Sequence, residues 1–311
     1  MSVPSNVSGA APKGVSTGDR LAVLPQHLLP KQALTRLAGI IASSRGGALT
    51  TALIRWFIGR YGVNMAEAAN PDPASYASFN EFFTRPLKPG ARPLAAAEWV
   101  CPVDGAISQF GGIDADRIFQ AKGHTYTTAA LLGGDAQLAR HFQGGHFATL
   151  YLSPRDYHRI HMPRAGRLLR MLHVPGELYS VNPATARGVP GLFARNERVV
   201  CVFDDPAAPP AQRLWVLVLV GATVVGSMAT SWHGVVNPPR PGSVRDWRYA
   251  DQRVELAQGD EMGRFLLGST VVMLMPPGPL AWNPAWAPGG AIRLGETMAT
   301  EPALVAPVTP A

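Results

Sequence analysis

The sequence predicts an α+β protein, a mostly antiparallel β catalytic core preceded by an N-terminal pair of amphipathic helices. The 311 residues include 32 glycines and 29 prolines, as expected for many short strands joined by turns. Apolar residues at helical spacing are concentrated between residues 31 and 60, and long helices are scarce after residue 142. The chain is also long enough to bury a sizeable core.

The chain carries 28 Lys and Arg residues against 21 Asp and Glu, a formal charge of +7. This excess favours contact with anionic surfaces such as phospholipid or nucleic acid. Because no nucleic-acid motif accompanies the charge, we expect no nucleic-acid partner. Cys101 and Cys201 lie far apart and form no Cys-x-x-Cys pattern, which indicates neither a zinc site nor a disulfide. We expect two buried reduced thiols in a cytosolic protein.

The two ends of the chain lack apolar periodicity. Residues 1–25 are predicted to form a disordered lead, because the first twenty are rich in Ser, Gly, Pro and Ala. The short apolar run 21–24 meets Pro25 and does not resemble a signal peptide. Residues 300–311, rich in Pro, Ala and Thr, are predicted to be a flexible tail.

Residues 26–70 are predicted to hold the helices. Apolar residues recur at three and four positions in two runs separated by Gly46-Gly47, with four arginines interleaved. Neither helix is long enough to span a bilayer. The pattern alone leaves two interpretations open, helices lying in a membrane interface or helices packed on the protein's own core. The apolar residues are Leu34, Leu37, Ile40, Ile41, Leu49, Leu53, Trp56 and Phe57.

A β-rich catalytic domain is predicted over residues 71–299. Its start is marked by Asn70-Pro71-Asp72-Pro73, which breaks the helical pattern, and by the aromatic and proline-rich link 79–93. The phenylalanines in this link favour a packed connection over a proline-rich ligand for a partner.

Within this domain we expect strands and one helix, 127–142, with Leu131, Leu138 and Phe142 on its apolar side. The uncharged stretch Leu214–Trp232 contains glycines and β-branched residues, so two adjacent buried strands are favoured over a membrane span. The segment 263–275 is predicted as a buried strand interrupted at Gly268-Ser269. The other expected strands are 103–107, 147–152, 167–181 and 197–204.

Three candidate groups have both a structural and a chemical interpretation. Asp104 precedes a glycine, which is more often turn chemistry than catalysis. His158 and His161 lie beside Asp156, but no second ligand cluster completes a metal site, so a general base or proton donor is favoured. At Gly268 a strand bulge is the ordinary expectation, yet the missing Cβ also lets a neighbouring hydroxyl reach its carbonyl carbon.

Taken together these motifs resemble phosphatidylserine decarboxylase proenzymes of the bacterial, membrane-associated branch, over roughly residues 30 to 298. The order and spacing of the motifs carry the resemblance. They are Phe82-Phe83-Thr84-Arg85-Pro86-Leu87-Lys88-Pro89-Gly90, Val103-Asp104-Gly105, Gly123-His124, Tyr157-His158-Arg159-Ile160-His161-Met162-Pro163, Gly221-Ala222-Thr223-Val224-Val225-Gly226-Ser227 and Leu267-Gly268-Ser269-Thr270.

The resemblance implies self-cleavage between Gly268 and Ser269 into a β chain, 1–268, and an α chain, 269–311. Asp104 would orient and charge-stabilise His161, which takes the proton of Ser269, as in a serine-protease triad. Ser269 would then become a covalent pyruvoyl group, the cofactor, with no metal. The amine of phosphatidylserine would form a Schiff base with it, lose CO2 and leave as phosphatidylethanolamine. His158 is the candidate proton donor, with a structural hydrogen bond as its alternative.

The resemblance also implies partners and a location. They are phosphatidylserine in an anionic membrane, a homodimer of processed units, and a peripheral position on the cytoplasmic face of the bacterial cell membrane. With the family in view, the membrane interpretation of the helices is favoured.

Two competing functions remain open. A serine hydrolase could use Asp104, His161 and Ser269 without self-cleavage, although no Gly-x-Ser-x-Gly elbow surrounds Ser269. A non-catalytic, basic membrane-binding β protein would explain the charge and the helices but would have no use for the three residues together.

Overall fold

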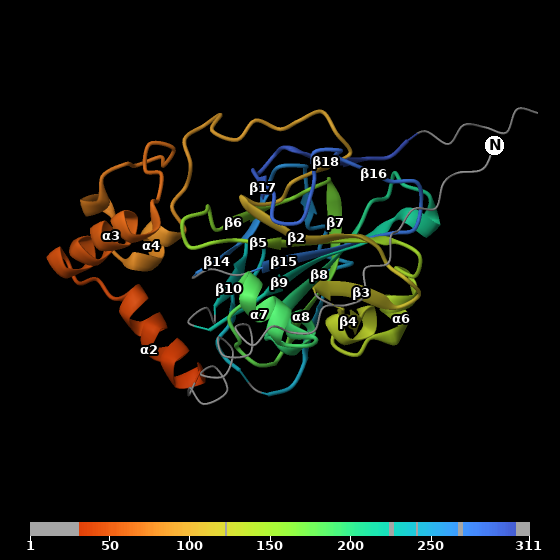
Figure 1. Cartoon of the computed structure of the whole chain (residues 1–311), viewed down its shortest axis with the longest axis horizontal. Helices are drawn as coiled ribbons and strands as arrows, with labels where there is room; N and C mark the ends of the chain where they lie inside the picture. The colour runs from red at the N-terminus through yellow and green to blue at the C-terminus, as the bar shows by residue number, and fades with distance from the viewer. Residues whose placement is uncertain (1–30, 122, 224–226, 241, 267–269, 303–311) are drawn as a thin grey trace, which may run out of the picture.

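The computed structural model describes residues 31–121, 123–223, 227–240, 242–266 and 270–302, so the predicted lead 1–25 lies outside the described residues. Figure 1 shows a layered β core with a small group of helices beside it. The predicted α+β class, with antiparallel sheets and N-terminal helices, is confirmed.

The N-terminal helices are α2 (Lys31–Ser43) and α3 (Ala48–Tyr61). They are separated at the predicted glycine pair, where Gly47 has a φ of 55°, a left-handed value that glycine adopts without strain. In the described residues no single helix is long and apolar enough to cross a membrane. Residues Leu37–Ser43 of α2 and α3 reach that length and apolarity only as a pair bent by 109°.

A short third helix, α4 (Phe79–Phe83), connects these helices to the core after the turn η1 (Pro73–Ser75). Ser78 caps α4 by accepting a hydrogen bond from the Glu81 amide. Its phenylalanines pack with Ile54 and Phe57 of α3, and the ring centroids of Phe57 and Phe79 lie 5.0 Å apart. The link is therefore packed, as predicted.

Large apolar side chains remain exposed on α2 and α3. On α3, Ile54 is fully buried while Leu49 is 81% and Trp56 58% exposed, so opposite sides of one helix face the protein and the solvent. The others are Leu37, Ile40 and Ile41 on α2 and Tyr61 at the end of α3. An exposed apolar group of this size on one side of a helix pair is typical of an interaction surface.

The core is a nine-stranded antiparallel sheet. Its central strand β15 (Thr270–Met275) pairs with β9 (Leu214–Val220) on one side and β5 (His146–Tyr151) on the other. The order across the sheet is β12 (Arg245–Arg248), β7 (Gly166–Val174), β8 (Arg198–Asp204), β9, β15, β5, β2 (Gly105–Gly112) and β17 (Ala291–Ile292), with β13 (Glu255–Leu256) also on β7.

Apolar clusters cover both faces of this sheet. Side chains alternate between the faces along each strand, so Val271 and Met273 join one cluster while Val272 and Leu274 join the other. Every residue of β15 is buried. The uncharged stretch forms two buried strands, as predicted, β9 and β10 (Met228–Thr230), but they belong to different sheets and do not pair with each other. Cys101 and Cys201 are both buried and free.

A four-stranded sheet lies beside the large one, in the order β11 (Gly234–Asn237), β10, β14 (Glu261–Phe265) and β6 (Arg159–His161). The remaining elements are β1 (Trp99–Val100), β18 (Thr297–Thr300) and β16 (Ala281–Trp282) in one sheet, β3 (Arg117–Ala121) and β4 (His124–Thr127) in another, α5 (Thr128–Leu131), α6 (Ala136–Arg140), α7 (Pro183–Gly188), α8 (Leu192–Arg195) and η2 (Pro210–Gln212).

Three sequence-based boundaries were wrong. The helix predicted over 127–142 is two short helices, because Gly133 and Gly134 adopt left-handed φ values of 76° and 94° between them. The strand predicted to reach residue 181 ends at Val174, before Pro175-Gly176. The segment predicted as one interrupted strand is β14 and β15, which belong to different sheets.

Candidate active site

The candidate site lies where the chain crosses from the small sheet to the large one. Strand β14 ends at Phe265, whose amide donates to the His158 carbonyl at 3.0 Å, and the Leu266 amide donates to the Ser227 carbonyl at 3.1 Å. Strand β15 then begins at Thr270, opposite Tyr151 of β5. The predicted cleavage pair, Gly268 and Ser269, falls in this crossing and lies outside the described residues.

His161, on β6, has both ring nitrogens in defined surroundings. Its Nδ1 lies 2.7 Å from the Gly259 carbonyl oxygen, which only accepts, so Nδ1 carries the proton. Its Nε2 therefore keeps its lone pair and lies 3.2 Å from the Tyr157 hydroxyl. Burial lowers the pKa of His161, so the neutral imidazole is favoured near pH 7. This is the protonation state that a general base requires.

Asp104 is buried immediately before β2, and its carboxylate is held from two directions. Arg92 donates from Nε to Oδ1 at 2.9 Å and from Nη2 to Oδ2 at 2.6 Å, and the Leu294 amide donates to Oδ1 at 2.9 Å. A Cβ on Gly105 would lie 2.3 Å from the Tyr151 carbonyl oxygen, so the close approach of β2 to β5 requires glycine here. The glycine of this Asp-Gly pair therefore serves strand packing.

The structure does not join Asp104 and His161 by a hydrogen bond. Gly259 holds the ring nitrogen that the resemblance assigned to Asp104, and Arg92 holds the carboxylate. Burial dominates the lowered pKa of His161; the Gly259 hydrogen bond and the charge of Glu261 act to raise that pKa, and the charge of Asp104 acts in the same direction with a smaller effect. A direct role for Asp104 in the cleavage stays a prediction.

His158 is fully buried at the same crossing. Its Nδ1 lies 2.8 Å from the Asp156 carbonyl oxygen and so carries the proton, while its ring packs on Phe83 with centroids 4.1 Å apart. Its Nε2 is buried without a hydrogen-bond partner among the described residues. Burial lowers the pKa of His158 to about 3, so this histidine is neutral at pH 7.

Sequence reasoning missed three contributors to this site. Tyr157 stood in a quoted motif but received no role, although its hydroxyl meets Nε2 of His161. Arg92 could have been found by asking which cation pairs with a buried Asp104. The role of the Gly259 carbonyl could not be predicted from the sequence, because every residue has a backbone carbonyl whatever its side chain.

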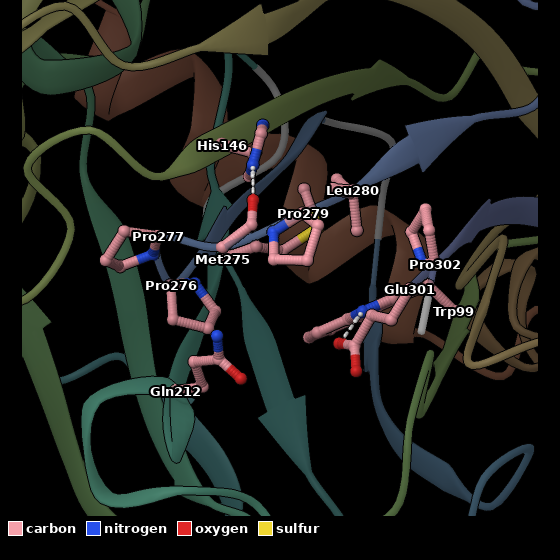
Figure 2. A pocket seen from close by; sticks show the side chains of 11 residues that line it. Trp99, His146, Gln212, Met275, Pro276, Pro277, Pro279, Leu280, Glu301 and Pro302 are labelled. Atoms are coloured by element: carbon pink, nitrogen blue, oxygen red, sulfur yellow. Dashed lines mark hydrogen bonds between the residues drawn. The ribbon is translucent and has the colours of Figure 1, made fainter. Parts of the chain in front are cut away.

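A cavity, shown in Figure 2, is lined by residues other than these. Its volume is about 230 Å3, and its walls include Trp99, His146, Glu301 and the prolines 276, 277 and 279. His146 contacts the Gly278 carbonyl oxygen at 2.9 Å, and Trp99 donates to Glu301 at 2.9 Å. None of the histidines or carboxylates of the candidate site lines it. Across the described residues, no group of three His, Cys, Asp or Glu side chains is arranged to hold a metal ion.

Comparison with known proteins shows the family of this chain. The family model described as phosphatidylserine decarboxylase matches residues 79–300, and a second model, described as PSD, matches residues 21–62. The chain is 74% identical over 280 residues to the phosphatidylserine decarboxylase proenzyme of Azoarcus sp. strain BH72, which covers 90% of this chain and 96% of that protein. It is 70% identical over 286 residues to the proenzyme of Albidiferax ferrireducens, covering 92% and 99%.

These matches define an enzyme of the lyase class that removes a carboxyl group as CO2. The chain belongs to the phosphatidylserine decarboxylase family.

Proposed function

We propose that this chain cleaves itself between Gly268 and Ser269 and then converts phosphatidylserine into phosphatidylethanolamine and CO2. The observation that supports this best is His161, a neutral histidine with an unprotonated Nε2 on the strand beside β14, in a chain of this family. The self-cleavage, the cofactor and the roles of individual residues are parts of this proposal.

In self-cleavage, His161 takes the proton of the Ser269 hydroxyl at Nε2. The serine oxygen then bonds to the carbonyl carbon of Gly268. The bond from this carbon to the Ser269 nitrogen breaks as the nitrogen takes the proton from His161 and leaves as an amine, which gives an ester. Loss of the Ser269 α-proton breaks the bond between Cβ and the ester oxygen and frees the carboxylate of Gly268. Addition of water and release of ammonia leave residue 269 as pyruvoyl.

Asp104 contributes to this step through its charge. An imidazolium forms when His161 accepts the proton, and a nearby buried carboxylate stabilises that positive charge. Arg92 holds Asp104 in place. It offsets the charge of Asp104 only in part, because the Arg92 guanidinium also donates to Glu67. Gly259 performs the orienting part of the role that the resemblance gave to Asp104.

After the cut, the sheet holds the two chains together. Strand β15 belongs to the α chain, yet both neighbours, β9 and β5, belong to the β chain, and β17 and β18 of the α chain pair with β2 and β1. Separating the chains would therefore break ladders on both sides of a fully buried strand.

Two described polar atoms near the ends of this crossing could serve a small polar group. The hydroxyl of Thr270 and Nε2 of His158 are both buried without partners in the part of the chain that the structure describes. Buried polar atoms of this kind ordinarily have a hydrogen-bond partner. When present, a pyruvoyl group supplies a ketone that takes the substrate amine and accepts the electrons released with CO2.

His158 is proposed to supply the proton that replaces the carboxyl group. The neutral ring already donates from Nδ1 to Asp156, so the transferred proton must sit on Nε2. Because Nε2 carries no proton in the neutral ring, it must first take one up from water, which burial opposes. As CO2 leaves, the negative charge of the carboxylate moves onto the substrate carbon, and this carbon then takes the Nε2 proton. Proton transfer is thereby tied to the chemical step.

The helices α2 and α3 are proposed to hold the enzyme against the cytoplasmic face of the bacterial membrane. Their exposed apolar side chains would enter the interface, and the net charge of +7 favours anionic lipid. A homodimer of processed units stays a prediction, which light scattering of the purified enzyme tests.

The proposed function is tested by mixing the purified protein with vesicles that contain phosphatidylserine labelled with 13C in its carboxyl group. We expect labelled CO2 and phosphatidylethanolamine from the wild type and neither product from His161→Ala, which also stays a single chain. Release of free serine or fatty acid in place of CO2 would contradict the proposal.

A further inference from the structure

A polar cavity of about 260 Å3 lies between the end of α3 and the candidate site. It is lined by Gly62, just after α3, by Asp104 and Tyr157 of the site, and by arginines that include Arg85, Arg92 and Arg293. It therefore joins the helices that we propose contact the membrane to the residues that we propose perform the chemistry.

The carboxylates of this cavity already have partners. Asp104 and Glu67 both accept from Arg92, and Glu67 also pairs with Arg293. Asp156 accepts from the amide and the hydroxyl of Ser153, at 2.6 and 2.7 Å.

Arg85 differs from the other arginines of the cavity. It is 3% exposed, and no carboxylate of the described residues lies within ion-pair distance of its guanidinium. Its guanidinium lies 5.4 Å from the centroid of the Phe82 ring, its Nη2 makes a long contact of 3.4 Å to the Arg155 carbonyl, and its Nε is buried without a partner. A buried charge is costly unless an opposite charge accompanies it.

We propose that this cavity binds the phosphate of the phospholipid substrate, with the guanidinium of Arg85 as its main ligand. The planar fork of an arginine matches the oxygens of a phosphate, and a phosphate would give Arg85 the direct ion-pair partner that it lacks among the described residues. This inference rests on the proposed function, because it assigns the headgroup of that substrate.

The alternative ligand is the carboxylate of the same headgroup. A cation that holds this carboxylate stabilises the substrate but not the transition state, in which the charge moves away from the departing CO2. The phosphate keeps its charge throughout the reaction, so binding it at Arg85 does not oppose decarboxylation.

The position of Arg85 relative to His158 suits this assignment. The Phe83 ring packs on His158, and Arg159 donates from Nε to the Thr84 carbonyl at 2.8 Å, so the segment 83–85 runs beside the segment 158–159. A headgroup with its phosphate at Arg85 can therefore extend its serine part toward His158. Its glycerol side then faces Gly62 and the end of α3, which carries exposed Trp56 and Tyr61.

The test compares Arg85→Gln and Arg85→Lys with Arg248→Gln in the processed enzyme. Arg248 is an exposed arginine on β12, at the opposite edge of the large sheet, and its loss changes the net charge equally. We expect Arg85→Gln to raise KM for phosphatidylserine in mixed micelles about tenfold or more, with kcat within threefold. The KM of Arg85→Lys should lie between those of the wild type and Arg85→Gln, and the KM of Arg248→Gln should equal that of the wild type. An unchanged KM in Arg85→Gln would overturn the proposal.

If Arg85→Gln fails to fold or to process, calorimetry on the wild type tests which part of the headgroup the cavity binds. We expect glycerophosphoserine to bind more tightly than inorganic phosphate, and free serine to bind more weakly than either. Equal binding of inorganic phosphate and glycerophosphoserine would indicate a site for free phosphate, and tighter binding of serine would indicate the carboxylate; both would overturn the proposal. Failure of the proposed function is seen separately, as absence of self-cleavage and of CO2 release by the wild type.

Discussion

Nδ1 of His161 lies 2.7 Å from the carbonyl oxygen of Gly259, which fixes the ring as the tautomer with an unprotonated Nε2, 3.2 Å from the Tyr157 hydroxyl. A backbone carbonyl cannot become protonated or change its charge near neutral pH. The base is therefore oriented by a partner that does not titrate, while the charge of Asp104 acts from a position where Arg92 holds it.

The first prediction concerns the pH dependence of self-cleavage. Burial lowers the pKa of His161 below its ordinary value of about 6.5, and the neutral ring is the active form. The cleavage rate of newly translated protein should be constant above pH 7 and fall about tenfold per pH unit below a midpoint under 6.5. Gel analysis over a pH series measures this midpoint. A midpoint above 7 would mean that His161 is not the base, or that a negative charge dominates its surroundings.

The second prediction concerns stability at low pH. In the folded state the pKa of His158 is about 3, against about 6.5 when unfolded, so between these values the unfolded chain binds the extra proton. Stability is therefore lost as pH falls from 6.5 toward 3, by up to about 5 kcal/mol from this residue. In a Ser269→Ala background, which keeps one chain, His158→Phe should reduce this slope in urea unfolding. An unchanged slope would argue that His158 is readily protonated in the folded protein.

The third prediction concerns Arg92, whose side chain is 8% exposed and which bridges Asp104 and Glu67. Removing one partner of a buried ion pair leaves the other charge uncompensated. Arg92→Gln should lower the free energy of unfolding by about 3 kcal/mol in the Ser269→Ala background. Arg170→Gln is the matched control, because Arg170 also bridges two carboxylates but is 25% exposed, and it should cost under about 1 kcal/mol. Equal losses in the two variants would show that burial does not set the energy of the Arg92 pair.

The fourth prediction concerns the exposed side of α2 and α3. Leu49→Ser and Trp56→Ser together should weaken binding to vesicles of phosphatidylglycerol and phosphatidylethanolamine roughly tenfold or more, because each removes apolar area that would enter the interface. Sedimentation with the vesicles measures this. Val235→Ser, an exposed apolar residue on β11, should bind as the wild type does. Full binding by the double variant would assign the exposed side to another partner.

Local signals in the sequence predicted the elements whose ends are set by local chemistry. Gly46-Gly47 marked the break between α2 and α3, and the uncharged stretch gave two buried strands. The glycine pair Gly133-Gly134 is a similar signal, but apolar spacing led to the prediction of one helix across these two left-handed residues. Strands β14 and β15 show a different limit, because apolar alternation does not say to which sheet a strand belongs.

For the candidate site, residue type and family motifs pointed to His158, His161 and Asp104, and the structure brings them to neighbouring segments. Their roles stay predictions. Their hydrogen-bond partners were not predictable, since Gly259 and Asp156 act through backbone carbonyls. Arg92 reaches Asp104 only because the link after α4 folds back onto the core.

The central claim is tested most directly by intact-mass spectra of the purified wild type and its Ser269→Ala variant. The account predicts two wild-type chains, residues 1–268 and residues 269–311, the second carrying pyruvoyl in place of its first serine. The variant should remain one chain of 311 residues. A wild type that folds and stays one chain would contradict self-cleavage, and a serine hydrolase or a non-catalytic membrane-binding protein would then be the better account.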